Sequence, residues 1–86
     1  MDRATDQDFG HATIRLQRVR PEKNERRFYA LVITPDLFGK AILVRNWGRI
    51  GTGGRLRREV CADLSVARAP LNDLTRRKRG RGYTEL

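Results

Sequence analysis

Apolar and polar residues alternate along the first part of the chain, and the alternation predicts β-strands. In Ala12–Arg20, Ile14 and Leu16 fall on one face of an extended chain and polar residues fall on the other, which is the two-residue period of a half-buried strand. Arg27–Thr34 is rich in β-branched and aromatic residues, which favour strands. The pattern therefore places two strands before residue 35.

Turn-forming residues separate these strands from two more, expected at Phe38–Ile50 and Arg55–Cys61. Proline and asparagine close a turn at Arg20–Asn24, and Pro35 ends the second strand. The Gly51–Gly54 segment lacks the lysine and the glycine spacing of phosphate-binding loops, and no helix follows it. A hairpin turn that needs positive φ explains it better, and short turns of this kind predict an antiparallel meander.

The last third of the chain has a helical period. Either Asp63 or Ser65 can cap the start of the helix. Apolar residues and one lysine recur there at steps of four and three positions: Ala67, Leu71, Leu74 and Lys78.

Pro70 complicates the start of this helix, because proline lacks a backbone N–H and disfavours helix at the residue before it. We expect a short first turn and then a helix over Pro70–Arg79; a helix kinked at Pro70 is the alternative. Gly80 and Gly82 end the helix, and Tyr83 can fold back onto the sheet.

Together these elements predict an α+β fold: a small antiparallel four-stranded sheet with one C-terminal helix packed on a face. With 86 residues, the chain has room for one core, so residues 11–86 are expected to form a single domain. Residues 1–10 are polar and are expected to be disordered. No cofactor or small-molecule substrate is expected, because a domain of this size cannot house two pockets of ordinary volume.

Charge is the strongest compositional signal. The chain has 19 Lys and Arg against 10 Asp and Glu, which leaves a net charge of +9, and 16 of the basic residues are arginine. The planar guanidinium group suits phosphate, and so large an excess is better tolerated when a polyanion neutralises it. Composition therefore favours a nucleic-acid partner, with general solubility as the alternative explanation.

Other compositional features exclude several classes of protein. Cys61 is the only cysteine, and His11 has no metal-ligand residue near it, so neither a disulfide nor a metal site is expected. The longest apolar stretch, Phe28–Thr34, is too short to span a bilayer, and residues 1–10 contain no secretory signal. We expect a cytoplasmic protein, associated with the nucleoid if the source is bacterial.

The segment around Trp47 carries the candidate chemistry. An indole at a strand end can stack on a base or sugar, Gly48 removes a side chain that would block close approach, and Arg49 can reach a phosphate. A stack on an exposed terminal base is unavailable in intact duplex DNA, so such a platform favours ends or single strands. The structural alternative is that Trp47 fills the core and Gly48 serves a bulge.

Arginines flank the glycine turn with no acidic residue among them. Alternation places Arg55 and Arg57 on one face, and if Arg45 and Trp47 share it, the turn carries a cationic rim. A solvated strand edge is the alternative reading. Residues 76–81 form a second basic cluster that suits a helix C-terminus or an electrostatic tether, and Lys78 is its expected phosphate contact.

The segment Asn46–Gly54 resembles the defining motif of the WGR domain family, in which Trp-Gly-Arg-hydrophobic-Gly follows a strand. The strand with Phe28 and Tyr29 before it, and Lys78–Tyr83 after it, fit the same pattern. The resemblance covers nearly the whole chain, from Ala12 to Tyr83.

The resemblance implies a function. WGR domains occur in poly(ADP-ribose) polymerases, in bacterial regulator-like proteins and as stand-alone bacterial modules. In the polymerases the domain binds DNA at a strand break; the motif tryptophan packs on the terminal sugar, and the motif arginine bridges DNA and neighbouring domains. Those roles would fall here to Trp47 and Arg49. The signalling role of the polymerases does not transfer, because this chain has no catalytic domain or zinc fingers.

The sequence thus favours a non-catalytic module that binds DNA at ends, nicks or single-stranded junctions. The expected contacts are Arg45, Trp47, Gly48, Arg49, Arg55 and Lys78. An adaptor that docks an acidic protein and an RNA-binding module are the alternatives. No nucleophile–base pair or pair of carboxylates suggests catalysis.

Overall fold

The computed structural model describes residues 13–85. Residues 1–10, which were expected to be disordered, lie outside that range. His11, which was expected to have no metal-ligand partner, lies outside it as well. The elements follow one another in the order β1, Thr13–Arg20; the 3-10 turn η1, Pro21–Lys23; β2, Glu25–Pro35; β3, Ala41–Arg49; β4, Arg55–Cys61; α2, Leu64–Gly80; and β5, Thr84–Glu85.

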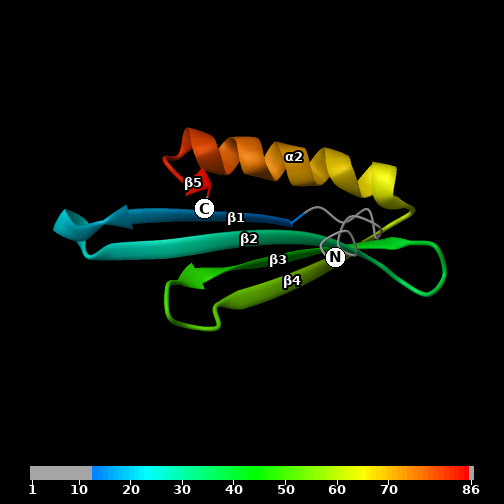
Figure 1. Ribbon diagram of the computed structural model, residues 1–86, viewed down its shortest axis with the longest axis horizontal. Helices are drawn as coiled ribbons and strands as arrows, with labels where there is room; N and C mark the ends of the chain where they lie inside the picture. The colour runs from blue at the N-terminus through cyan, green and yellow to red at the C-terminus, as the bar shows by residue number, and fades with distance from the viewer. Residues whose placement is uncertain (1–12, 86) are drawn as a thin grey trace, which may run out of the picture.

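The strands form one antiparallel sheet in the order β4-β3-β2-β1-β5 (Figure 1). The expected α+β class and the meander of the first four strands are confirmed. The expected number of strands is wrong, because the chain after the helix adds a fifth: Thr84 and Glu85 pair with Gln17 and Leu16 of β1. A two-residue strand has no sequence period, so alternation could not reveal it.

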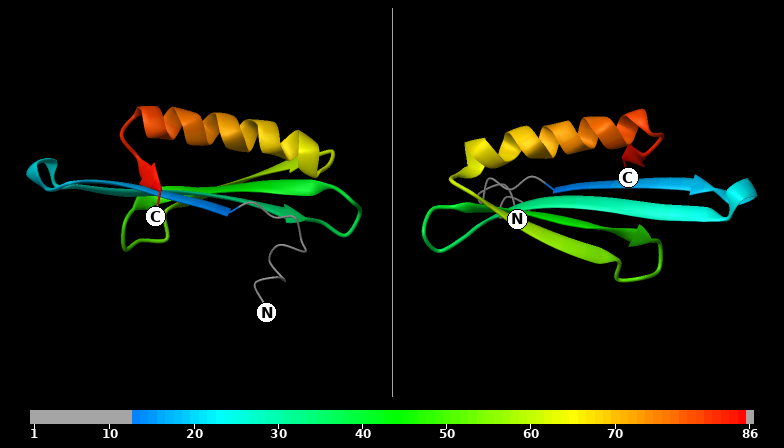
Figure 2. Two further views of the ribbon diagram at one scale, coloured as in Figure 1. Left: turned by 45° about the horizontal axis from the view of Figure 1, so that its top comes forward. Right: turned by 180° about the vertical axis from the view of Figure 1, so that it is seen from behind.

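Helix α2 lies along one face of the sheet as a second layer (Figure 2). We call the sheet surface under it the helix face and the opposite surface the open face. Tyr29, Leu31 and Leu43 on the helix face are buried, and on the helix Ala67 and Leu71 are buried as well. The core is the space between these two layers.

The helix runs without interruption through Pro70, so the expected start at Pro70 is wrong. Asp63 is the cap: its side chain accepts a hydrogen bond of 3.0 Å from the N–H of Val66. Pro70 removes one backbone hydrogen bond, but burial of Ala67 and Leu71 on either side of it holds both halves of the helix on the sheet. The predicted end at Gly80 and the folding back of Tyr83, which is buried, are confirmed.

The third strand begins at Ala41, later than expected. Asp36 accepts hydrogen bonds of 2.8 Å from the N–H groups of Phe38 and Lys40, and these bonds fold the preceding residues into a turn. Phe38 and its neighbour Leu37 are exposed at the tip of this turn. No helix within residues 13–85 has the length and apolar character to cross a membrane.

Candidate nucleic-acid interface

Trp47 lies on the helix face near the end of β3. It is paired with Tyr29 on one side and with Arg55 on the other, so the three side chains share that face. The indole is half-buried and packs against the core; its centroid lies 6.1 Å from that of Tyr29, with 36° between the ring planes. Trp47 is therefore a supported ring with an accessible part, neither sealed in the core nor free of it.

Arg45 and Arg57 lie opposite each other on the same face, one pair further along the strands. No ion pair within residues 13–85 involves Arg45, Arg55 or Arg57. Like charges directly opposite each other are destabilising, and the buried Nε of Arg45 has no hydrogen-bond partner in that part of the chain. Arg45, Arg55 and Arg57 thus lie on the same face as Trp47 and form no ion pair with an acidic residue of the described part of the chain, while their expected contact with phosphate stays a prediction.

Part of the hydrogen-bonding capacity of the Arg49 guanidinium group is used within the protein. Its guanidinium group donates hydrogen bonds to the backbone oxygen and the side-chain oxygen of Asn24, at 3.1 and 3.2 Å. Asn24 has φ 52° and ends the turn between β1 and β2, a conformation that asparagine tolerates. Arg49 thus ties this turn to the end of β3, and the residue as a whole is exposed.

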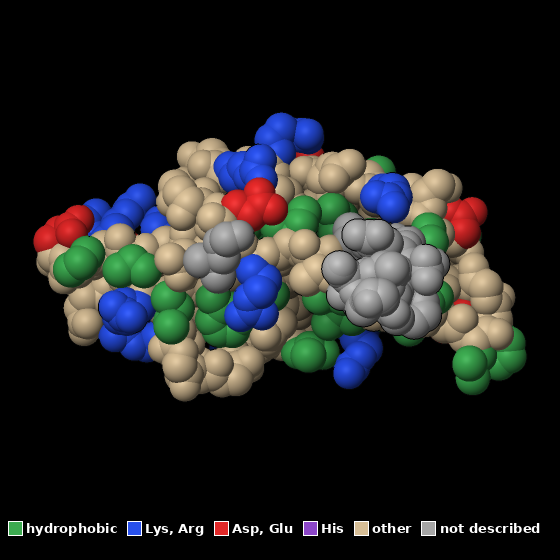
Figure 3. Space-filling model, in the orientation of Figure 1, with side chains coloured by type: hydrophobic (Ala, Val, Ile, Leu, Met, Phe, Trp, Pro, Cys, Tyr) green, Lys and Arg blue, Asp and Glu red, His purple; other side chains and the backbone are tan. Residues whose placement is uncertain are grey.

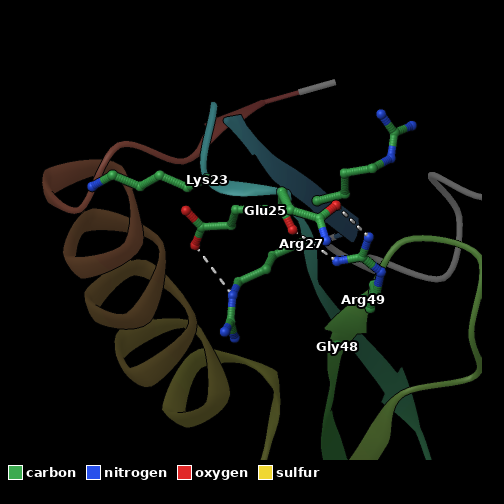
Figure 4. A pocket seen from close by; sticks show the side chains of 7 residues that line it. Lys23, Glu25, Arg27, Gly48 and Arg49 are labelled. Atoms are coloured by element: carbon green, nitrogen blue, oxygen red, sulfur yellow. Dashed lines mark hydrogen bonds and ion pairs between the residues drawn. The ribbon is translucent and has the colours of Figure 1, made fainter. Parts of the chain in front are cut away.

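A hollow of about 320 Å³ lies between this turn and the end of β3. In Figure 4, Lys23 extends away from Arg49, and Glu25 and Arg27 lie between them. Four basic side chains and one carboxylate line the hollow, so its net charge is positive. The complete lining is Lys23, Asn24, Glu25, Arg26, Arg27, Gly48 and Arg49.

The one carboxylate of this hollow is already paired. Glu25 contacts Arg18 at 2.5 Å and Arg27 at 3.2 Å, with Arg20 at 3.8 Å. The hydrogen bond from Arg18 does most to hold the pKa of Glu25 below its usual value, and the charges of the three arginines lower that pKa further. Glu25 is therefore ionised at neutral pH and neutralises part of this basic cluster.

The structure itself requires a glycine at position 48. A Cβ atom there would lie 2.8 Å from the Cα of Gly54, which is closer than real Cβ contacts come. The glycine therefore lets the β3–β4 turn fold against the strand end. Its expected role in the approach of nucleic acid stays a prediction.

Lys78 projects from α2 towards the same aromatic residues. Its ammonium lies 4.5 Å from the ring centroid of Tyr29 and 5.3 Å from that of Tyr83, both cation–π distances. Burial lowers the pKa of Lys78, and nearby arginines lower it further. Lys78 is therefore brought close to Trp47 through Tyr29, but it is also part of the packing that holds the helix end.

The rest of the C-terminal basic cluster is largely paired. Arg76 and Arg77 contact Asp73 at 2.8 and 2.9 Å, and Arg79 contacts Glu85. In Figure 3, basic side chains outnumber acidic ones, and several lie at the end of the molecule where the turn η1 is found. The cluster contributes positive charge, while Arg45, Arg55 and Arg57, which form no ion pair within residues 13–85, lie on the sheet.

Sequence reasoning missed the support beneath the tryptophan. Tyr29 touches Trp47, and Tyr83 contacts Tyr29 edge-on at 6.5 Å. Arg27 lies opposite Arg49 across β2 and β3. The pairing of Arg27 and Tyr29 with motif residues could be found only by aligning the two strands in register, which alternation within one strand does not give.

Comparisons with known proteins identify the family of the chain. Residues 12–86 match the model of the WGR domain. The chain is similar to y4dW, an uncharacterised protein of Sinorhizobium fredii, with 43% identity over 68 residues. The match covers 79% of this chain and 33% of the relative, so this chain spans only about a third of the relative's length. No solved structure matches the chain significantly. On the match over residues 12–86, this chain belongs to the WGR domain family.

Proposed function

We propose that this protein is a non-catalytic module that binds nucleic acid, DNA in preference to RNA, at strand ends, nicks or single-stranded junctions. WGR domains serve as nucleic-acid-binding modules in proteins related to poly(ADP-ribose) polymerases, and the domain itself is non-catalytic. The single observation that carries the proposal is the half-buried Trp47 beside three arginines without ion-pair partners in residues 13–85.

The proposed contacts divide into two kinds. Arg45, Arg49 and Arg55 contact phosphates, which gives affinity without sequence preference. The indole of Trp47 stacks on an exposed sugar or base, which in the case of a base contributes about 1–3 kcal/mol. Because an intact duplex offers no exposed terminal stack, the second contact supplies the preference for ends.

A binding panel tests both parts. The substrates are an intact circular duplex, the same circle with one nick, blunt duplex, single-stranded DNA and RNA, each titrated in a gel-shift or anisotropy assay. We expect the nicked circle to bind more tightly than the intact one. Equal affinity for these two would contradict the preference for ends, and tighter binding of RNA would redirect the proposal to RNA.

Strand β4 offers a matched pair of variants. Arg55→Ala removes an arginine on the helix face, and Arg58→Ala removes one from the open face of the same strand. At about 0.15 M salt, loss of one phosphate contact should weaken binding about fivefold and reduce the salt slope by about 0.9. The expected result is that Arg55→Ala has this effect on every substrate and Arg58→Ala does not.

Trp47→Ala should remove the discrimination between nicked and intact circles and leave the salt slope nearly unchanged. Since Trp47 packs against the core, the variant will also be less stable, so binding is measured at a temperature where circular dichroism shows it folded. Trp47→Phe, which keeps an aromatic ring, should retain part of the discrimination. Loss of all binding in folded Trp47→Ala would contradict the division of roles.

A further inference from the structure

The open face of the sheet carries exposed apolar side chains. Its residues alternate with those of the core, and within residues 13–85 no helix or strand packs on it (Figure 2). Val60 is 63% exposed and Leu56 52% exposed, and Ile42 and Val44 beside them are only partly buried. A contiguous apolar surface of this kind commonly marks a place where another chain packs.

The polar residues of this face share one sign of charge. Arg15, Arg26 and Arg58 alternate with the apolar residues, and no acidic residue within residues 13–85 points to this face. None of the three arginines takes part in an ion pair in this part of the chain. The face is therefore complementary to a surface that combines aliphatic groups with carboxylates.

A hollow of about 290 Å³ lies at one end of the open face, and Arg15 lines it, so an anionic group of a partner could bind there. Arg15, Gln17, Phe28 and Asn46 line it together with the loop 50–53. The side-chain nitrogen of Asn46 donates hydrogen bonds of 3.0 and 2.8 Å to the backbone oxygens of Gly53 and Arg55. The loop that walls the hollow is thus fixed, and Arg15 is available to receive an anionic group.

The residue types favour protein over nucleic acid as the occupant. Bases bind by stacking on aromatic rings, and Phe28 is the single aromatic residue on this face among residues 13–85, where Val19, Val32, Ile42, Val44, Leu56 and Val60 supply the apolar area. A second copy of this chain is disfavoured, because two such faces would bring arginines against arginines.

We propose that the open face docks an acidic amphipathic segment of a partner protein. Aliphatic side chains of the segment pack on Val44, Leu56 and Val60, and its carboxylates pair with Arg58 and, in the hollow, with Arg15. This site lies on the opposite side of the sheet from Trp47, so it does not depend on the proposed nucleic-acid site.

A selection from a displayed library of random 16-residue peptides, with the intact chain as bait, tests the proposal. We expect enriched peptides that combine aliphatic and acidic residues. Their affinity, measured by anisotropy, should fall at least tenfold for the double variant Leu56→Ser/Val60→Ser. Both side chains are more than half exposed, so the variant should remain folded, and its melting curve checks this.

A charge reversal gives the sharper test. Arg58→Glu should weaken peptide binding at least fivefold. Replacing acidic residues of the peptide by lysine should restore the binding of this variant. Arg57→Glu, on the helix face, is the control and should leave peptide binding unchanged. The proposal is overturned if no peptides are enriched, if they lack acidic residues, or if Arg57→Glu matters and Arg58→Glu does not.

Two further measurements exclude other occupants. In sedimentation experiments the unmodified chain should not self-associate through this face. Self-association that is lost in Leu56→Ser/Val60→Ser would assign the face to a second copy of the chain. The same double variant should bind DNA as the unmodified chain does; a loss equal to that of Arg55→Ala would assign the face to nucleic acid.

Discussion

At the scale of single residues, two glycines bring the end of β3 and the turn after it into contact. A Cβ atom on Gly54 would lie 2.3 Å from the backbone oxygen of Trp47 and 2.8 Å from the ring of Phe28, and Gly54 has φ +70°. Gly48 faces Gly54 from the other side. The position of Trp47 therefore depends on backbone atoms that only glycine allows to come this close.

Gly54→Ala should destabilise the protein by at least about 2 kcal/mol, because it adds strain at positive φ to a clash with backbone. Gly53→Ala is the matched control: a Cβ atom there meets nothing within 4 Å and its φ is ordinary, so a change within about 0.5 kcal/mol is expected. Urea denaturation measures both. Equal effects of the two substitutions would contradict the contact described.

The lowered pKa of Glu25 predicts that the protein loses stability as the pH falls. Because its pKa is lowered in the folded protein, it contributes stability that is complete above the ordinary glutamate pKa and is lost as the pH falls through the folded-state pKa. Glu25→Gln should lower the melting temperature by a few degrees at pH 7, and the difference should disappear in acid. Glu22→Gln, at an exposed position in the neighbouring turn, is the control and should change the melting temperature little.

At the scale of elements, helix α2 tolerates a proline because both ends are anchored. Asp63 caps its start, and Arg81 at its end donates its N–H to the oxygen of Lys78 at 3.0 Å. Between them Pro70 leaves one carbonyl, that of Val66, without its usual partner. The helix thus persists through these end contacts and through the burial of Ala67 and Leu71 against the sheet rather than through propensity.

Pro70→Ala should therefore stabilise the protein by about 1–2 kcal/mol, less than the full cost of about 3 kcal/mol for proline in a helix interior, because proline also restricts the unfolded chain. Val66→Ala, at a half-exposed position of the same helix, should change stability little. Denaturant midpoints compare the two. A loss of stability in Pro70→Ala would mean that the helix start depends on proline.

The sequence was informative where a pattern lay within one element. The glycine turn before it predicted a strand at Arg55–Cys61 with the observed bounds, and alternation within that strand placed Arg55 and Arg57 on one face. It failed where tertiary contacts decide: the start of β3 follows from the hydrogen bonds of Asp36, and β5 from its pairing with β1. The half-burial of Trp47 is also decided by tertiary contacts, because Tyr29, which packs against it, comes from another strand.

At the scale of the whole molecule, positive charge opposes folding. The net charge of +9 repels itself in the compact state, and the pair Arg45–Arg57 concentrates the repulsion at one place. A polyanion bound there relieves this repulsion, and salt screens it in part.

The melting temperature should therefore rise between about 0.05 and 0.5 M sodium chloride, and further with excess duplex oligonucleotide at low salt. Binding itself should respond in the opposite sense: with five phosphates neutralised, log affinity should fall with log salt at a slope of about −4.5. Thermal melts and titrations at several salt concentrations measure the two. A slope near zero would contradict binding through arginines.

Strand β4 contributes side chains to both surfaces in alternation, Arg55 and Arg57 to one and Leu56, Arg58 and Val60 to the other. One layer of polypeptide is all that separates them there. A DNA end and a docked protein would thus be held roughly 10 Å apart across the sheet, a separation of the order of the spacing between neighbouring packed layers. This edge of the domain would then act as a coupler, which holds the docked protein close to the broken strand on the other side of the sheet.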